Sequence, residues 1–369
     1  MIINLKSQND LSGFYIIYEG STNLEKKGNY GVSHLLEHLV CKTFFDLLED
    51  FDRDSISWNA YTDSNLINFH FTGIESRLDK YRNKILKAVS EFNITKEQFE
   101  NERNIVLSEY EDSFNEQSGS HYLNLYRKLF NDYDPIGLKE DLENLKFMDC
   151  LNFYEEQYMK PTKIINVSKT KKLKNLDIDF SDRKIEKKIE YGNHKVPFEL
   201  GNSFKDKTSL IILSPVIEEN NAHVHFLNAM ISLGLKSPLY QEVRENQGLV
   251  YFINCYQSRH NKQGLVNIST QTSNKNVTKV VDAVKSVFDN PSKFLTKDRF
   301  NLVKDYYKVR MQKDEILRYK NVNQWINPEG WSVYEILDTV NLKKIKEVYD
   351  KYFKFENFYV SNDKTEFKK

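Results

Sequence analysis

His34-Leu35-Leu36-Glu37-His38 is the stretch of sequence that decides the fold and chemistry of this chain. It lies inside a run from Gly31 to Cys41 that is otherwise almost wholly hydrophobic and therefore predicts a buried helix. On a helix, positions i, i+3 and i+4 share one face, so two imidazoles and one carboxylate project together. Burying such groups without partners is costly, and a divalent metal held by both histidines removes that cost. The alternative is a buried histidine pair bonded to backbone or to Glu37.

A candidate third ligand lies further along the chain, in the stretch from Thr95 to Asp112, whose pattern predicts a helix. Glu102 and Glu109 are seven residues apart, which is two turns, so both project from the same face. Zinc in hydrolytic sites usually takes three protein ligands and keeps one position for water. One of these carboxylates could bind the metal and the other could orient a histidine ligand. A solvated acidic helix face is the alternative.

The two patterns together, His34-x-x-Glu37-His38 and Glu102-Arg103-x-x-Val106-x-x-Glu109, resemble the pitrilysin or insulinase family of zinc metallopeptidases (inverzincins). The family includes the mitochondrial processing peptidase and many bacterial two-domain homologues. The resemblance implies one zinc ion per chain, held by His34, His38 and Glu109 and supported by Glu102. It implies that Glu37 is the general base. Zinc follows from the ligand types, and cobalt or manganese could occupy the same site in vitro.

The segment Asn59-Ala60-Tyr61-Thr62-Asp63, which leads into a predicted strand from Leu66 to Thr72, also resembles the family. In the family this strand is an edge near the metal, and the substrate pairs with it as an added strand. The resemblance implies that Asn59 and Ala60 contact the substrate. Backbone pairing of this kind gives affinity with little demand on sequence. An ordinary turn and strand is the alternative.

A third match is the segment from Ser237 to Tyr251, which resembles the family's C-terminal motif. There an arginine and a tyrosine seven residues apart hold the substrate and stabilise the tetrahedral oxyanion, and here those positions are Arg244 and Tyr251. A guanidinium and a phenol are suitable donors to such an oxyanion. A helix-end arginine and a strand tyrosine are the alternative.

Smaller features agree with the family or depart from it. The segment Asp134-Pro135-Ile136-Gly137 looks like a family landmark. Ser168 replaces the glycine that usually closes the last strand of the first half. Cys41 lies one turn beyond the histidine motif, and we interpret it as a packing residue because two histidines and a glutamate already fill the site.

Internal repetition predicts two domains. The segment from Asn93 to Phe99 echoes that from Phe294 to Phe300, and each follows an amphipathic run. In this register Glu102 and Glu109 correspond to Val303 and Arg310, so the repeat has lost the metal chemistry. We expect a metal-binding catalytic domain at 1–178, a charged linker at 179–194 and a duplicated domain without metal at 195–369.

Composition excludes other classes of function. Lysine plus arginine and aspartate plus glutamate both number 53, so no net charge draws the chain to nucleic acid or membrane. No apolar stretch is long enough to span a bilayer, and the N-terminus lacks the pattern of a signal peptide. The three cysteines are few and widely spaced, which suits a reducing compartment. We expect a cytoplasmic protein.

The sequence thus predicts an α+β protein of two duplicated, structurally similar α/β-roll domains that form half of a clamshell chamber. The predicted function is a zinc-dependent endopeptidase that hydrolyses short or unfolded peptides bound as an added β-strand in the closed chamber. The predicted assembly is a homodimer in which each active site is shared between subunits. The alternatives are a non-catalytic family member, one subunit of a heterodimeric processing peptidase, and a structural domain with an accidental motif.

Overall fold

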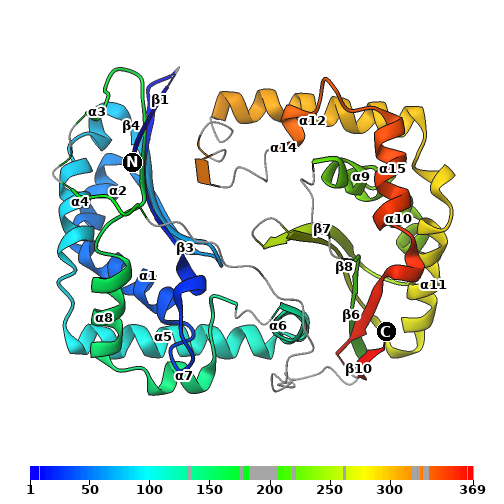
Figure 1. Ribbon diagram of the computed structural model, residues 1–369, viewed down its shortest axis with the longest axis horizontal. Coiled ribbons are helices and arrows are strands. Elements are labelled where there is room, and N and C mark those ends of the chain that lie inside the picture. Colours follow the sequence, from blue (N-terminus) through cyan, green and yellow to red (C-terminus); the bar gives the residue numbers. More distant parts are fainter. Residues whose placement is uncertain are drawn as a thin grey trace. The chain divides into compact units, whose positions relative to one another are not determined.

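The computed structural model describes residues 1–7, 9–130, 134–174, 176, 178–182, 206–215, 217, 222–260, 263–317, 322, 325–326, 332–363 and 365–368 (Figure 1). The chain divides into two compact units, residues 1–113 with 129–194 and residues 114–128 with 195–369. Both combine helices with a sheet, which confirms the predicted α+β class and the presence of two domains. Most of the predicted linker, residues 183–194, lies outside the described residues. The exact domain boundaries therefore stay a prediction.

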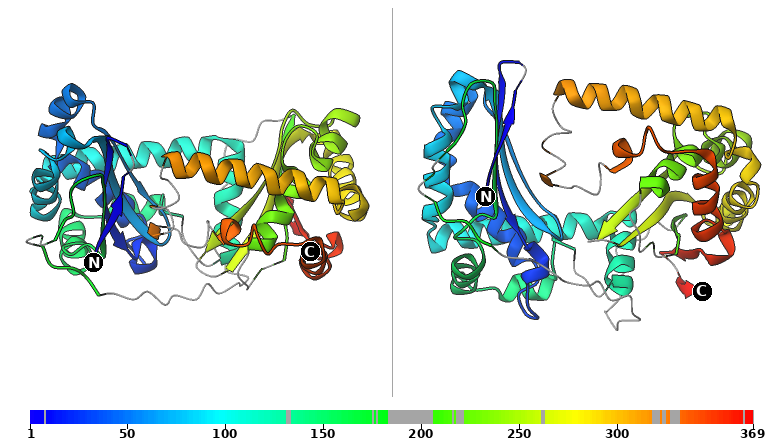
Figure 2. Two further views of the ribbon diagram at one scale, coloured as in Figure 1. Left: turned by 90° about the horizontal axis from the view of Figure 1, so that it is seen from above. Right: turned by 45° about the horizontal axis from the view of Figure 1, so that its top comes forward.

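The first unit is built on a five-stranded sheet of order β1-β5-β2-β4-β3. Its strands are β1 (Ile2–Lys6), β2 (Leu11–Glu19), β3 (Ser57–Thr62), β4 (Leu66–Ile74) and β5 (Lys163–Ser168). Its helices are α1 (Val32–Thr43), α2 (Leu48–Asp54), α3 (Glu75–Leu78), α4 (Arg82–Glu91), α5 (Lys96–Asn115), α7 (Lys139–Asn144) and α8 (Phe147–Gln157). Strands β1 and β5 are parallel, and the other neighbours are antiparallel. Figures 1 and 2 show the helices gathered on one face of this sheet.

Alternation along the strands explains which face the helices cover. Phe14 on β2 lies opposite Phe71 on β4, and both side chains are fully buried. The ring of Phe44, at the end of α1, contacts that of Phe71 with centroids 5.4 Å apart. Because side chains alternate between the two faces of a strand, Phe14 and Phe71 show which face of the sheet packs against α1.

One expectation about this sheet was wrong. The strand from Leu66 to Thr72 is not an edge, because β4 lies between β2 and β3. The edge is β3, and it contains Asn59 and Ala60 themselves. The segment expected to precede the strand is itself a strand, Ser57–Thr62. The chain then turns at Asp63, whose carboxylate accepts hydrogen bonds from the backbone N–H groups of Asn65 and Leu66.

The second unit repeats the plan with a sheet of order β10-β9-β6-β8-β7. Its strands are β6 (Lys207–Leu213), β7 (Ile253–His260), β8 (Gln263–Ser273), β9 (Tyr359–Asn362) and β10 (Thr365–Lys368). Its helices include α6 (Gln117–Phe130), α9 (Ala222–Ser232), α10 (Pro238–Tyr240), α11 (Val277–Phe288), α12 (Lys297–Leu317), α14 (Ser332–Glu335) and α15 (Leu342–Tyr352). Strands β6, β8 and β7 correspond to β2, β4 and β3, whereas β10 is antiparallel to its neighbour and β1 is parallel.

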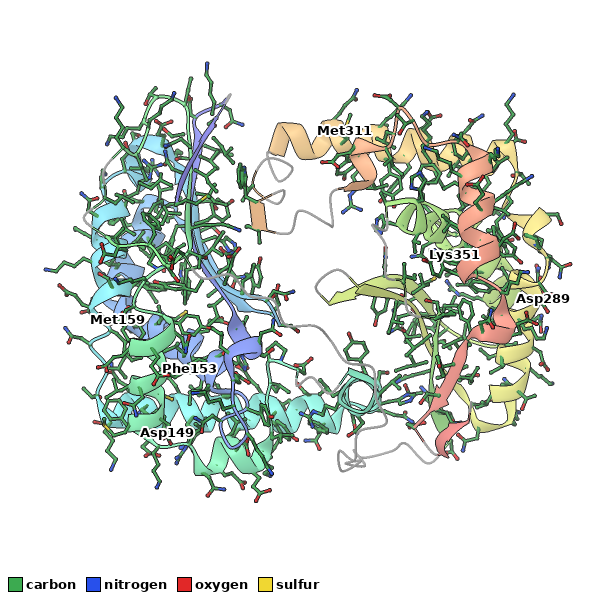
Figure 3. All side chains as sticks on the ribbon, viewed as in Figure 1. Asp149, Phe153, Met159, Asp289, Met311 and Lys351 are labelled. Atoms are coloured by element: carbon green, nitrogen blue, oxygen red, sulfur yellow. The ribbon has the colours of Figure 1, made fainter. Side chains whose placement is uncertain are left out.

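An apolar core joins α9 and α11 of the second unit to their sheet. Leu210 and Ile212 point from β6 into a cluster with Phe226 of α9 and Phe288 of α11, and all four are at most 1% exposed. Labelled residues in Figure 3 mark α8 in the first unit (Asp149 and Phe153, with Met159 just beyond it). They also mark α12 and α15 and the C-terminal end of α11 in the second unit (Met311, Lys351, Asp289).

Helix α6 belongs to the second unit, although its sequence lies in the first half of the chain. His121 on this helix is 2% exposed and lies between two serine hydroxyls, with Nδ1 3.0 Å from Ser209 Oγ and Nε2 2.8 Å from Ser361 Oγ. Ser209 alternates with Leu210 along β6, so α6 covers the sheet face opposite the apolar cluster. Burial lowers the pKa of His121 to about 4, which keeps this imidazole neutral.

The start of α1 is fixed by a carboxylate and two glycines. Glu25 accepts hydrogen bonds from the backbone N–H groups of Gly31 and Ser33, at 3.0 and 2.8 Å. A carboxylate in this place satisfies open N–H groups and complements the helix dipole. Gly31 has φ +98° and Gly137 has φ +75°, and a Cβ on Gly137 would lie 2.4 Å from the Gly31 Cα. The predicted landmark that ends in Gly137 thus packs against the first turn of the histidine helix.

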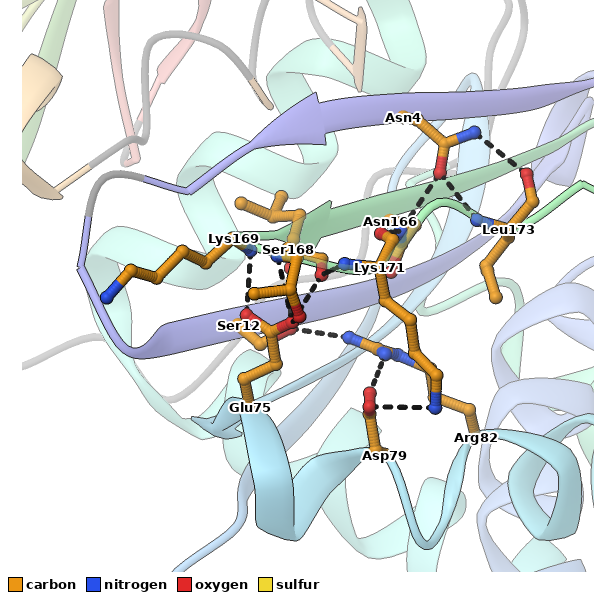
Figure 4. Close-up of polar contacts among 12 residues, drawn as sticks. Asn4, Ser12, Glu75, Asp79, Arg82, Asn166, Ser168, Lys169, Lys171 and Leu173 are labelled. Carbon is orange, nitrogen blue, oxygen red and sulfur yellow. Dashed lines mark hydrogen bonds and ion pairs between the residues drawn. The ribbon is translucent and has the colours of Figure 1, made fainter.

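A second polar cluster closes the end of β5 (Figure 4). The Glu75 carboxylate accepts hydrogen bonds from the Ser168 and Thr170 hydroxyls at 2.7 and 2.6 Å, and from the backbone N–H groups of Lys169 and Thr170. Ser168 Oγ also accepts from the Lys171 N–H. Ser168, which departs from the family's glycine, therefore takes part in closing the strand. Burial alone would raise the pKa of Glu75, but these hydrogen bonds outweigh it and lower the pKa to about 2.

Among the described residues, no helix is both long enough and apolar enough to cross a membrane.

Replacing Gly137 by alanine should destabilise the first unit by about 2–5 kcal/mol, because the new Cβ meets the Gly31 backbone and φ is positive. Gly28→Ala is the matched control, since Gly28 has φ +92° but open space around its Cα. This control should lose only about 1–2 kcal/mol. Urea unfolding followed by circular dichroism compares the two variants, and equal losses would contradict the close contact.

Replacing Glu75 by glutamine should remove roughly 2 kcal/mol of stability at pH 7, where the native carboxylate is ionised. The folded pKa lies below the ordinary value of 4.5, so the stabilisation is complete above pH 4.5 and is lost as the pH falls towards 2. The difference in unfolding free energy between wild type and Glu75→Gln should therefore shrink from pH 7 to pH 3. The control, Glu111→Gln on an exposed ion pair, should cost little at any pH.

Candidate metal centre

Helices α1 and α5 bring together the three predicted ligands of the first unit. His34 Nε2 lies 3.5 Å from Glu109 Oε2, and His38 Nε2 lies 3.7 Å from Glu109 Oε1. The two imidazole planes are nearly perpendicular, with centroids 4.9 Å apart. One potential ligand atom from each of the three residues lies within 4.8 Å of the other two. The helix spacing that motivated the prediction thus places both histidines against one carboxylate.

This geometry suits a small tetrahedral cation. Zinc binds imidazole nitrogen and carboxylate oxygen at about 2.1 Å, which separates neighbouring tetrahedral ligands by about 3.4 Å. The nitrogen–oxygen distances of 3.5 and 3.7 Å, one to each oxygen of Glu109, are close to that separation. Among the described residues, His34, His38 and Glu109 form the one group of histidine, cysteine and acidic side chains close enough to hold a metal. Three protein donors leave a fourth position for water.

Burial sets the protonation of His34. Desolvation, and to a smaller extent the neighbouring His38, lower the pKa of His34 to about 4. At neutral pH this imidazole is therefore uncharged, which is the form that binds a metal. Its Nδ1 atom is buried and has no hydrogen-bond partner among the described residues. The two histidines differ in this respect, because His38 has a partner on the side away from Glu109.

That partner is Glu102, which lies 4% exposed beneath the site. One of its oxygens lies 3.2 Å from His38 Nδ1 and the other lies 2.9 Å from the Lys42 ammonium. A carboxylate that accepts from Nδ1–H orients the ring and presents Nε2 towards Glu109. Lys42, one turn beyond His38, compensates the buried negative charge. Glu102 thus has the geometry of the supporting residue that the sequence comparison implied.

Glu37 is held beside the same group by a strand residue. The Thr62 hydroxyl on β3 donates to Glu37 Oε2 at 2.5 Å. Burial raises the pKa of Glu37, while the hydrogen bond from Thr62 and the nearby His38 lower it and Glu109 raises it, with a net increase. Glu37 is 8% exposed, and it adjoins a ligand without belonging to the group of three.

Cys41 does not join the ligands, as expected from the sequence. The candidate group contains two histidines and a glutamate but no cysteine. Burial, followed by the charges of Glu37 and Glu102, raises the pKa of the Cys41 thiol far above its ordinary value.

Asn59 and Ala60 lie on the edge strand β3, three and two residues before Thr62. Ala60 pairs with Phe69 of β4 and Asn59 pairs with His70. The described residues add no strand to the other side of β3, so its outer backbone groups face no ladder partner there. Asn59, Ala60 and Thr62, the residue that donates to Glu37, thus all lie on one strand.

In the second unit, Arg244 and Tyr251 lie next to each other. The Arg244 guanidinium carbon lies 4.8 Å from the centre of the Tyr240 ring and 5.5 Å from that of Tyr251. Arg244 occupies a π-helical turn, Gln241–Asn246, of the kind that often marks functional sites. Tyr251 is 83% exposed, so its ring rests against Arg244 while its hydroxyl reaches solvent.

The metal group has no counterpart among the described residues of the second unit. In the repeat register, Val303 on α12 stands where Glu102 stands on α5, and it is fully buried in the apolar core. Arg310 stands in place of Glu109, and a cation there cannot serve as a metal ligand.

Two residues of the site were missed from the sequence. Lys42 gave no signal beyond its place one turn after His38, and an exposed helix lysine usually has no such role. Thr62 stood in the quoted segment Asn59 to Asp63, and the period of two along a strand places it on the same face as Trp58 and Ala60. Only the packing of β3 against α1 shows that this face meets Glu37.

Two family models match this chain. Residues 13–134 match the model described as Insulinase (Peptidase family M16), which covers both helices of the metal group. Residues 185–307 match the model described as Peptidase M16 inactive domain. That description agrees with the loss of the metal ligands from the described residues of the second unit.

Relatives of similar length support the match. Proteins described as uncharacterized zinc proteases are 24% identical in Rickettsia felis and 22% identical in Rickettsia bellii, each over 92% of this chain and 89% of the relative. The fold is shared with a protease from Helicobacter pylori, with TM-score 0.77, 15% identity and coverage of 98% of this chain and 96% of the other. It is also shared with a peptidase M16 inactive domain from Pseudomonas fluorescens, with TM-score 0.75, 14% identity and coverage of 98% and 94%. With both halves of the chain matched and the histidine motif on the first, the protein belongs to the insulinase family of peptidases, family M16.

Proposed function

We propose that this protein is a zinc-dependent endopeptidase that hydrolyses short or unfolded peptides. The observation that carries the proposal is the convergence of His34, His38 and Glu109, with one ligand atom of each within 4.8 Å of the others and Glu37 held beside them. The zinc-protease descriptions of the Rickettsia relatives support the choice of metal and of reaction class.

The residues of the site divide the chemistry between them. His34, His38 and Glu109 would hold one zinc ion, which supplies a Lewis acid that acidifies water. Glu37 has one oxygen bound by Thr62, and its other oxygen would take the proton of the attacking water and deliver it to the leaving amine. Its raised pKa suits both steps, because a base that must later act as an acid works best with a pKa closer to neutrality. Glu102 and Lys42 fix the orientation of His38.

The substrate is proposed to bind as an added strand along β3. This strand is the edge of the sheet in the described residues, and Asn59 and Ala60 lie on it. Backbone pairing to such an edge needs an extended, unpaired peptide, which explains a preference for short or unfolded chains. The clamshell chamber expected for the family would enclose that peptide.

Arg244 and Tyr251 are proposed to complete the site by holding the substrate and stabilising the oxyanion. In a homodimer with two-fold symmetry, each metal-binding domain can receive these two residues from the partner subunit. We also infer a cytoplasmic location, which is supported by three cysteines that are all unpaired.

Two other functions within the family would require a different set of residues from the one present here. A non-catalytic member would be expected to lack part of the metal group, whereas His34, Glu37, His38 and Glu109 are all present. A subunit of a heterodimeric processing peptidase would take its arginine and tyrosine from another protein, whereas Arg244 and Tyr251 are present and stacked.

Replacing Glu37 by glutamine should abolish peptide cleavage and leave zinc binding intact, because the amide cannot accept the proton and Glu37 is not among the three ligands. The assay is cleavage of a quenched fluorescent peptide library by zinc-loaded protein, with zinc content measured by atomic absorption. Cleavage by Glu37→Gln at the wild-type rate would refute the assigned role.

Glutamine variants of α5 provide the controls. Glu109→Gln should lose bound zinc and activity together. Glu111→Gln, which breaks an exposed pair with Lys139, should keep both. If wild type binds zinc but cleaves nothing, the endopeptidase proposal fails and the non-catalytic or heterodimeric alternative takes its place.

Sharing of active sites predicts complementation between two inactive variants. Glu37→Gln and Arg244→Ala should each be inactive alone, but a mixture that exchanges subunits should recover about a quarter of wild-type activity. Half of the random dimers would be mixed, and each would contain one intact site. Size-exclusion chromatography with light scattering establishes the dimer. Subunit exchange without recovery would show that sites are not shared in this way.

A further inference from the structure

A hydrogen bond from Thr62 on the edge strand β3 reaches Glu37 beside the candidate metal ligands. Thr62 Oγ1 lies 2.5 Å from Glu37 Oε2. Among the described residues, no other side chain hydrogen-bonds to Glu37, and the two histidines and Glu109 contact one another instead. The orientation of this carboxylate within the site therefore depends on one hydroxyl.

The sheet presents that hydroxyl rigidly. Trp58, Ala60 and Thr62 alternate onto the face of β3 that is turned towards α1. The Trp58 ring meets the Phe44 ring at the end of α1, with centroids 5.1 Å apart and planes at 86°. Thr62 itself pairs in register with Ile67 of β4, which is 1% exposed. As a β-branched residue, threonine has few χ1 rotamers, so its hydroxyl has a defined direction.

A buried glutamate next to two histidines needs such a restraint. Glu37 lies one position before His38 and one turn after His34, so its carboxylate is within reach of any cation that these histidines hold. A carboxylate that turned onto the metal would occupy the position that water must take. With Oε2 bound to Thr62, the other oxygen remains available to a water molecule.

We propose that Thr62 is a positioning residue that holds the Glu37 carboxylate off the metal and aims its second oxygen at the hydrolytic water. The proposal rests on the endopeptidase function for its kinetic consequence. Its structural content, the direction of the Glu37 carboxylate, does not depend on turnover.

Thr62→Val is the decisive variant, because valine keeps the shape and the strand preference of threonine but lacks the hydroxyl. We expect kcat to fall about tenfold to hundredfold, as for other small displacements of catalytic groups, with KM changed less than about twofold. Thr62→Ser restores the donor and should recover kcat to within about threefold of wild type. Thr72→Val on β4 is the matched control, since its hydroxyl is 3.5 Å from the Ser57 carbonyl oxygen and contacts no site residue.

A second measurement separates this proposal from the proposed function. With cobalt in place of zinc, visible absorption reports the number and type of ligands. Thr62→Val should alter the spectrum because Glu37 is free to coordinate, and Thr62→Ser and Thr72→Val should not. This readout requires metal binding but no cleavage, so it decides the position of Glu37 even if the wild-type protein cleaves no peptide.

The outcomes are distinct. If the wild type is active, a Thr62→Val protein with unchanged kcat overturns the proposal, and so does a Thr62→Ser protein as slow as Thr62→Val. A loss that serine restores supports it. If the wild type is inactive, the proposed function fails, and an unchanged cobalt spectrum in Thr62→Val then overturns the role of Thr62 as well.

Discussion

The gathering of three carboxylates around two histidines on one helix is the constraint on which the rest of the first unit depends. Glu37, Glu102 and Glu109 meet around two imidazoles in a partly buried place, where like charges interact strongly. Lys42 compensates one of them at 2.9 Å, and a divalent cation would compensate the other two. The Glu25 cap, the contact between Gly31 and Gly137 and the packing of β3 on α1 all fix the helix that carries the histidines. These contacts together hold α1, and with it the two histidines, in place.

The parts of this site that follow from local spacing were predictable from the sequence. The spacing of four from His34 to His38 and that of seven from Glu102 to Glu109 each define one helix face, and the structure brings those faces together. Contacts between elements distant in sequence were not predictable in the same way. Nothing local shows that Thr62 meets Glu37 or that Lys42 meets Glu102, because both depend on how β3 and α5 pack against α1. The edge strand was placed one strand too late for the same reason, since pairing order is a tertiary property.

The duplicated halves show how one scaffold keeps or loses a cluster of histidine and acidic side chains. Helices α5 and α12 follow equivalent sequence signals, and a buried position on each faces the centre of its unit. Glu102 uses that position to bond His38, whereas Val303 uses it for apolar packing. A buried carboxylate is tolerated only where a histidine and a lysine satisfy it, so losing the histidines removes the reason to keep the acid. The stacked Arg244 and Tyr251 show that the second half retains polar side chains elsewhere.

Helix α6 has a consequence for any attempt to separate the two halves. The chain leaves the first unit before α6, packs this helix on the second sheet through His121, and then returns to finish the first unit at β5. The units are therefore interlocked along the sequence rather than strung one after the other. A protease nick between 179 and 194 would leave fragments that stay associated through the buried face of α6. In the isolated amino-terminal fragment that face of α6 would be exposed to solvent and free to bind the second sheet or to aggregate.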